Sequence, residues 1–255
     1  MDTYKKLIKN QETRMKILEL ITWVPDSIMI RLQYFIKLKR VLHLKNPKRY
    51  TEKLQWYKLY YRDPLLTKCA DKYLVRDYVK SKGLGHILNE LYGVYDSVED
   101  IDFTKLPKRF VIKLNNGSGT NILVDDKDRL NFTETKETLR NWLTRKNISA
   151  GREWCYHDIS PKIIIEKYLD MDENNDLPDF KFFCFNGKIF CLYTMINYIR
   201  DHRKGKLAFY DINFNKLPYR RKDYGYITDN LNAPTNFDEM VKIAHILCQG
   251  FPHVR

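Results

Sequence analysis

Apolar residues recur at helical spacing through the first forty residues of the chain, and a proline interrupts the pattern. We therefore expect helices over residues 3–42 with a break near Pro25, and an end to this block at Asn46-Pro47. The positions with helical spacing are Ile8, Met15, Leu18 and Ile21 before the break, and Ile28, Leu32, Phe35, Ile36 and Leu42 after it.

Three further helices are predicted from capping residues and apolar spacing. Residues 51–61, TEKLQWYKLYY, form one with Thr51 as its N-cap, and Asp63-Pro64 opens another from about Leu65 to Ser81. Near the C-terminus, Asn236 with Glu239 three residues later predicts a capped helix that Gly250 ends, and FPHVR (251–255) then begins a strand.

The central part of the chain changes to short apolar runs that are typical of strands. Two of the runs flank a glycine-containing loop (115–120), and two are joined by Asn186-Gly187, which suits a type I′ hairpin turn. Residues 170–178 predict an acidic loop. The runs are FVIKL (110–114), NILV (121–124), KIIIEKYL (162–169), FKFFCF (180–185) and KIFCLYTM (188–195).

Composition excludes several classes of protein. With 44% hydrophobic and 14% aromatic residues the 255-residue chain is not intrinsically disordered. It has no uninterrupted apolar stretch long enough to span a membrane, and its N-terminus, MDTYKKLIKN, lacks a signal core, so we expect a cytoplasmic protein. Its five cysteines form no CxxC pair, which argues against a disulfide framework and a structural zinc site.

The charge is strongly positive and unevenly distributed. The formal net charge is +13, and residues 1–50 hold twelve Lys/Arg against four Asp/Glu. Such a region can face an anionic substrate, the inner membrane surface or a nucleic acid. Because the chain has no recognisable nucleic-acid-binding signature, we expect no nucleic-acid partner and leave peripheral membrane contact open.

The loop between the two predicted strands could bind a polyphosphate. Gly117 and Gly119 would let backbone N–H groups approach phosphates, and Lys113 would supply a positive charge. The alternative is an ordinary hairpin with a flexible turn and a solvated lysine, and the loop alone does not decide between them.

Other candidate residues also have two interpretations each. Glu166 to Leu169 could present polar groups to an adenine ring, or could be a solvated strand end; Lys181 could face a cleft or solvent. Lys72, with Arg76 one turn on, could reach a nucleotide or lie on a solvated face. Asp211 and Asn213 could offer oxygen ligands to Mg²⁺ or form a turn. No catalytic residue is identifiable.

Taken together, six blocks of the chain resemble, in order, the TupA-like ATP-grasp family of bacterial polysaccharide biosynthesis. The resemblance covers roughly residues 46–255. The blocks are NPKRYTEKLQWYKLYYRDPLLTKCADKYLVRDYV, LPKRFVIKLNNGSGTNILV, SPKIIIEKYL, DFKFFCFNGK, FYDINFN and NFDEMVKIAHIL.

This resemblance implies an α+β, ATP-grasp fold and an enzyme that joins a carboxylate to an amine by way of an acylphosphate, with ATP and Mg²⁺ as cofactors. It also implies that the substrates are uronic acid or amino acid groups of bacterial capsule or cell-wall polysaccharides. The implied organisation is a basic helical region over 1–62, a first ATP-grasp part over 63–169 and a second over 170–255.

The resemblance also assigns roles to residues. Lys72 and Lys113 would bind the nucleotide phosphates, with Lys181 near them, and Asn116, Gly117, Ser118, Gly119 and Thr120 would form a phosphate flap. Glu166, Lys167, Tyr168 and Leu169 would form the adenine hinge. In the family, an Arg-Val-Asp strand and a strand bearing a Glu supply metal-binding carboxylates. The chain stops at Arg255, so we expect truncated C-terminal strands and weak or absent ligase activity.

Two other functions compete with the ligase. A glycosyltransferase-type polysaccharide protein would instead need a nucleotide-sugar site. A basic nucleic-acid or membrane-surface binding module would use residues 1–50 and bind in a salt-dependent way. Neither the identity of the carboxylate and amine nor the oligomeric state follows from the sequence.

Overall fold

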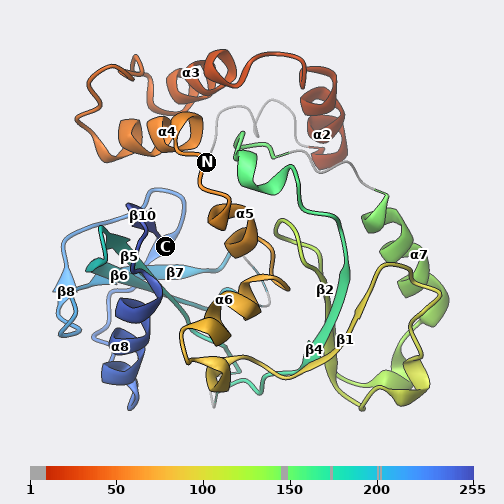
Figure 1. The fold of residues 1–255 in the computed structure, drawn as a ribbon. Helices are drawn as coiled ribbons and strands as arrows, with labels where there is room; N and C mark the ends of the chain where they lie inside the picture. Colours follow the sequence, from red (N-terminus) through yellow and green to blue (C-terminus); the bar gives the residue numbers. More distant parts are fainter. Residues whose placement is uncertain (1–9, 145–148, 173–174, 200, 202) are drawn as a thin grey trace. The chain divides into compact units, whose positions relative to one another are not determined.

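A computed structural model describes residues 10–144, 149–172, 175–199, 201 and 203–255 (Figure 1). The chain divides into two compact units: unit 1 comprises Met1–Tyr78 and Ile87–Tyr168, and unit 2 comprises Val79–His86 and Leu169–Arg255. Each unit has its own largely antiparallel sheet and its own core. Helices combined with such sheets confirm the predicted α+β class.

The N-terminal part of unit 1 is helical with a break near Pro25, as predicted. The helices are α2 (Gln11–Leu20), α3 (Asp26–Leu38) and α4 (Tyr50–Tyr60). The second helix ends earlier than predicted, because Lys39 takes a left-handed backbone conformation at φ 55°. Leu42 instead packs into a small core with Ile30 and Tyr34. Ile8 lies outside the described residues.

The start of α4 corrects the predicted N-cap. The helix begins at Tyr50, and the capping carboxylate is Glu52, which accepts the backbone N–H groups of Lys48 and Arg49 at 3.0 Å each. The Thr51 hydroxyl is hydrogen-bonded to the Tyr34 hydroxyl instead, at 3.0 Å. The sequence pattern therefore predicted the position of the helix correctly but assigned its N-terminal cap to the wrong residue.

The single helix predicted from Leu65 to Ser81 is two helices, α5 (Leu65–Ala70) and α6 (Val75–Ser81). Asp71 separates them, because its carboxylate accepts the N–H groups of Tyr73 and Leu74 at 2.7 and 3.1 Å. A carboxylate that binds backbone N–H groups two and three residues ahead offers the chain an alternative to continuous helix.

The sheet of unit 1 has four strands in the order β1-β4-β2-β3, each antiparallel to its neighbours. The predicted runs at 110–114, 121–124 and within 162–169 are confirmed as strands. The first strand and the helix α7 (Phe132–Leu143), seen beside the sheet in Figure 1, were not predicted. The strands are β1 (Leu91–Tyr95), β2 (Phe110–Leu114), β3 (Asn121–Val124) and β4 (Ile163–Lys167).

Side chains alternate between the two faces of the sheet along β2 and β4. One face is therefore apolar, and the other carries both apolar and charged residues. Odd positions of β4 and even positions of β2 enter the core, where they pack with Leu139 of α7. The opposite face carries Val111, Lys113, Ile164 and Glu166. Short 3-10 helices at Gly85–Ile87, Phe103–Lys105, Lys127–Arg129 and Trp154–Tyr156 complete the described helical segments.

Unit 2 is built around a sheet in the order β10-β5-β6-β7-β8, with β9 parallel to β7. Asn186 and Gly187 have φ of 47° and 72°, which confirms the predicted hairpin with both turn residues in the left-handed region. The strands are β5 (Asp179–Phe185), β6 (Lys188–Ile196), β7 (Lys206–Tyr210), β8 (Lys216–Leu217), β9 (Gly225–Tyr226) and β10 (His253–Val254).

The predicted C-terminal helix and strand are also confirmed. Helix α8 (Phe237–Leu247) packs Phe237 and Met240 against one face of the sheet, and β10 pairs with β5. The predicted cap is wrong, because the Asn236 side chain makes no capping hydrogen bond. Among the residues that the structure describes, no helix is long and apolar enough to cross a membrane.

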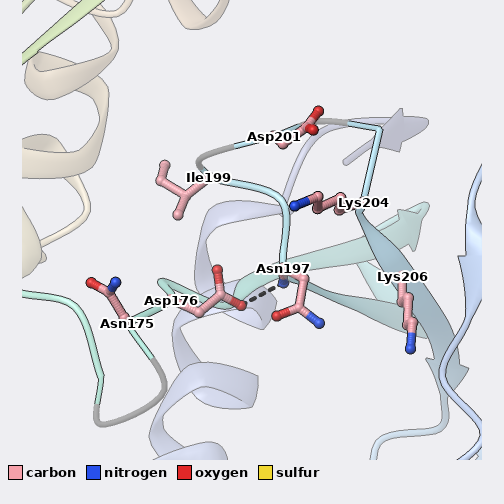
Figure 2. Close-up of a pocket in the computed structure, with 7 residues that line it drawn as sticks. All are labelled: Asn175, Asp176, Asn197, Ile199, Asp201, Lys204 and Lys206. Carbon is pink, nitrogen blue, oxygen red and sulfur yellow. Dashed lines mark hydrogen bonds between the residues drawn. The ribbon is translucent and has the colours of Figure 1, made fainter.

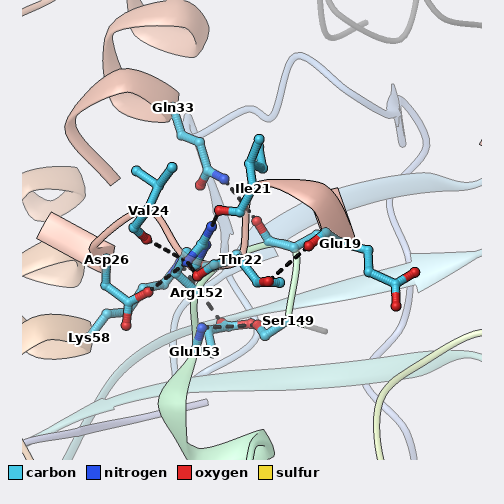
Figure 3. Close-up of polar contacts among 12 residues, drawn as sticks. Glu19, Ile21, Thr22, Val24, Asp26, Gln33, Lys58, Ser149, Arg152 and Glu153 are labelled. Atoms are coloured by element: carbon cyan, nitrogen blue, oxygen red, sulfur yellow. Dashed lines mark hydrogen bonds and ion pairs between the residues drawn. The ribbon is translucent and has the colours of Figure 1, made fainter. Parts of the chain in front are cut away.

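A buried arginine ties the N-terminal helices to the rest of unit 1. The Arg152 guanidinium donates to the backbone carbonyls of Ile21 and Val24 at 2.8 and 3.0 Å, and to the Asp26 carboxylate at 3.1 Å (Figure 3). These groups lie in the turn between α2 and α3 and at the first residue of α3. The same side chain therefore binds the C-terminal end of one helix region and the start of the next.

We expect Arg152→Ala to lower the free energy of unfolding by roughly 3 kcal/mol, because it leaves buried carbonyls and Asp26 without their donor. Urea titration followed by tryptophan fluorescence measures this change. Arg129→Ala is the matched control: the Arg129 side chain is 89% exposed, and its loss is expected to cost less than about 0.5 kcal/mol. Equal effects of the two substitutions would contradict the role given to Arg152.

Candidate functional site

The face of the four-stranded sheet opposite the core carries a charged cluster. Because Val111 pairs with Glu166 and Lys113 with Ile164 across β2 and β4, Lys113 and Glu166 are diagonal neighbours on that face. The Lys113 ammonium is 2.5 Å from one Glu166 carboxylate oxygen. Arg76, from α6, lies 3.5 Å from the other oxygen.

The cluster is buried rather than solvated. The side chains of Glu166 and Arg76 are 9% and 13% exposed, and the second terminal nitrogen of Arg76 donates to the Asn89 carbonyl at 2.7 Å. A carboxylate that leaves water needs compensating charge, and Glu166 has a cation on each side. The alternative interpretation of Glu166 and Arg76 as solvated surface charges is therefore wrong.

Lys72 is held against the base of the glycine loop. Its ammonium donates to the carbonyls of Gly117 at 2.6 Å and Leu114 at 3.1 Å. Its backbone N–H donates to the Asn115 carbonyl at 2.9 Å. The turn that Asp71 makes between α5 and α6 thus positions both the main chain and the side chain of Lys72 on the loop.

The environment of Lys72 lowers its pKa from 10.5 to about 8. Burial is the main cause, the positive charge of Lys113 adds to it, and the carboxylates of Asp71 and Glu166 act in the opposite direction. Because the folded pKa lies below the unfolded value, the protonated side chain costs stability below pH 8. That cost is relieved as the pH rises from about 8 to 10.5.

Asn115 organises the loop, a role that the sequence did not indicate. Its side-chain amide donates to the Asp71 carboxylate at 2.8 Å and to the Ser160 carbonyl at 3.0 Å. Its side-chain oxygen accepts the Lys162 N–H at 2.8 Å. A fully buried residue with these bonds links the end of β2 to the start of β4 and to the turn that bears Lys72.

The loop itself has the features expected of a phosphate flap. Gly117 and Gly119 have φ of 67° and 82°, a region that residues with a Cβ rarely adopt, and nothing lies within 4 Å of where a Cβ would be. Asn116 is buried, Gly117, Ser118 and Gly119 are exposed, and Thr120 is half-buried. Exposed backbone beside Lys72, with the charge of Lys113 nearby, suits a polyphosphate.

The predicted hinge residues begin in β4 and continue past it. The strand ends at Lys167, whose N–H donates to the Glu90 carbonyl at 2.9 Å and whose carbonyl accepts the Asn89 side chain at 2.9 Å. Its backbone groups are therefore not free for a ligand. Tyr168 is buried, with a raised pKa caused mainly by burial, and Leu169 is exposed.

The remaining predicted residues belong to unit 2. Lys181 on β5 forms an ion pair with Asp179. The Asp211 carboxylate accepts the N–H groups of Asn213 and Asn215 and the Asn215 side-chain amide, at 2.8 to 3.0 Å. These bonds explain the Asp-x-Asn sequence as a turn. Among the described residues there is no group of three His, Cys, Asp or Glu that could hold a metal ion.

Unit 2 also contains two adjoining cavities that share Asp176 and Asn197 (Figure 2). The Asp176 carboxylate accepts the Asn197 N–H at 2.6 Å, a contact drawn in Figure 2. The first cavity is about 600 Å³ and the second about 430 Å³. Neither lining includes any of the candidate site residues that the sequence indicated. In the second, the buried Thr194 hydroxyl has no partner among the described residues.

Comparison with protein families identifies the chain. A family described as TupA-like ATPgrasp matches residues 52–255, so the chain belongs to the TupA-like ATP-grasp family and has the ATP-grasp fold. This confirms the resemblance noted from its motifs. A comparison with curated proteins gives no match.

Among solved structures, the chain is similar to the ATP-grasp ligase PsnB complexed with a phosphomimetic variant of a minimal precursor, Mg and ADP. The identity is 11%, the match covers 80% of this chain and 50% of PsnB, and the TM-score is 0.34. It is also similar to phosphoribosylamine–glycine ligase from Thermotoga maritima, with 13% identity, 79% and 50% coverage and a TM-score of 0.40. The chain spans about half the length of these structures.

The Lys72 environment predicts how substitutions move its pKa. Lys113→Met is expected to raise the pKa above about 8, and Glu166→Gln to lower it, because Lys113 and Glu166 act on it in opposite directions. The pH dependence of Lys72 acylation, followed by peptide mass spectrometry, measures each midpoint. Shifts in the reverse order, or no shift in either variant, would contradict the arrangement.

Proposed function

We propose that the chain binds ATP at the glycine loop of unit 1 and uses it to ligate a carboxylate to an amine. The proposed substrates are uronic acid or amino acid groups of bacterial surface polysaccharides. Membership of the TupA-like ATP-grasp family supports the nucleotide and the reaction class. The observation that carries the proposal is that Lys72 lies against a loop with two left-handed glycines, beside the Lys113–Glu166–Arg76 cluster on the sheet face.

In this proposal ATP supplies the phosphoryl group that makes a carboxylate reactive toward an amine. The residues of the chain hold the polyphosphate in position and balance its charge, which are the main contributions a protein makes to phosphoryl transfer. Lys113 provides a charge from the sheet, and the exposed backbone of Gly117 to Gly119 provides N–H donors.

Glu166 has a supporting role in the same proposal. Before a nucleotide binds, its carboxylate compensates Lys113 and Arg76 and keeps both side chains on the sheet face. Lys72 holds the loop through the carbonyls of Gly117 and Leu114, so the flap has a defined shape in advance. We assign no residue of the chain to Mg²⁺.

Calorimetric titration with Mg·ATP tests the nucleotide site. We expect the parent chain to bind and Lys113→Met to bind at least about tenfold more weakly, because one charge-assisted contact to phosphate is lost. Lys108→Met is the matched control, since the Lys108 side chain is 66% exposed and carries the same charge; its affinity is expected to stay within about twofold of the parent.

A parallel titration with UDP-glucuronate separates the competing function. Binding of the nucleotide sugar by a folded parent that ignores Mg·ATP would contradict the proposal and favour a glycosyltransferase-type protein. Equal loss of affinity in the Lys108 and Lys113 variants would also contradict it, because the effect would then follow net charge rather than the site.

A further inference from the structure

Helix α3 is apolar on two opposite faces. The inner face packs into unit 1, but the opposite side carries Ile28, Leu32 and Phe35, whose side chains are 57%, 51% and 52% exposed. Spacings of four and three residues place these three on one line along the helix. We call them the apolar stripe. The buried residues of the inner face are Met29, Ile30 and Tyr34.

A large aromatic residue lies just before this helix. Trp23, in the turn between α2 and α3, is 80% exposed, the most exposed large apolar side chain among the described residues. Leu20 before it and Val41 after α3 are also exposed. So many unburied large apolar side chains within about twenty residues are unusual for a surface that faces only water.

The segment that follows Asp26 carries only basic charges. Residues 27–50 contain seven Lys or Arg and no Asp or Glu. All seven are exposed: Arg31, Lys37, Lys39, Arg40, Lys45, Lys48 and Arg49. A basic segment with an exposed apolar stripe and an exposed tryptophan complements a surface that is negatively charged and has an apolar layer beneath it.

The helix is fixed with the apolar stripe outward. Ile30 and Tyr34 pack against Leu42 and Leu44 in the small N-terminal core. At the start of the helix, Arg152 holds the preceding turn and Asp26 (Figure 3). The stripe cannot turn inward without breaking these contacts.

We propose that α3 and the turn before it dock on an anionic membrane surface, with the apolar stripe and Trp23 entering the headgroup layer. The basic side chains then contact lipid phosphates. A nucleic acid would account for the charge but not for the stripe. A symmetric second copy would bring two basic segments close together, and repulsion between their like charges opposes that arrangement.

Vesicle sedimentation with the full chain tests the proposal. We expect binding to vesicles of phosphatidylcholine mixed with phosphatidylglycerol, and at least about tenfold weaker binding to phosphatidylcholine alone. Leu32→Glu with Phe35→Glu is expected to weaken binding to the anionic vesicles at least about tenfold, because charged groups resist entry into the apolar layer. Ile246→Glu, an exposed position on α8, is the control and is expected to bind like the parent.

A second readout follows Trp23 directly. Anionic vesicles are expected to shift tryptophan fluorescence to shorter wavelength in the parent, and Trp23→Phe is expected to lose that shift. Three results would overturn the proposal: no vesicle binding by the folded parent, equal loss of binding in the control and the stripe variant, or a lipid-free dimer that the stripe variant dissociates. Binding to duplex DNA that the stripe variant retains, without vesicle binding, would assign the segment to nucleic acid instead.

Discussion

The ion pair of Glu166 with Lys113, extended by Arg76, is the interaction on which the candidate site depends. It places a carboxylate and two cations on a sheet face from which water is largely excluded. Opposite charges there stabilise one another, and removing one leaves the others uncompensated. An anionic ligand at the glycine loop would meet Lys72 already positioned, with the charge of Lys113 nearby.

The backbone around this cluster holds Lys72 against the loop. Asp71 ends α5, and its carboxylate also accepts the Asn115 amide. Asn115 in turn joins β2 to the start of β4, the strand that bears Glu166. One connected hydrogen-bond network therefore fixes both the positions of the charged groups and the shape of the loop before any ligand binds.

Strand alternation and turn chemistry predicted most of the elements, because FVIKL, KIIIEKYL and the Asn186-Gly187 hairpin are strong local signals. The break at Asp71 was missed, since its carboxylate competes for N–H groups only in the folded geometry. For a similar reason, the sequence left open whether Arg76 and Glu166 are buried, because residues distant in the sequence decide their burial. The role of Asn115 could not be predicted, because the three hydrogen-bond partners of its side chain are distant in the sequence and follow no periodic pattern.

The most direct test of the central claim measures proton uptake when Mg·ATP binds at pH 8.5, by calorimetry in two buffers of different ionisation enthalpy. Because the pKa of Lys72 is about 8, the side chain is partly neutral at this pH, and nearby phosphates favour its charged form. The account predicts net proton uptake in the parent and none in Lys72→Arg, which keeps its charge. Binding without uptake, or uptake that persists in Lys72→Arg, would contradict it.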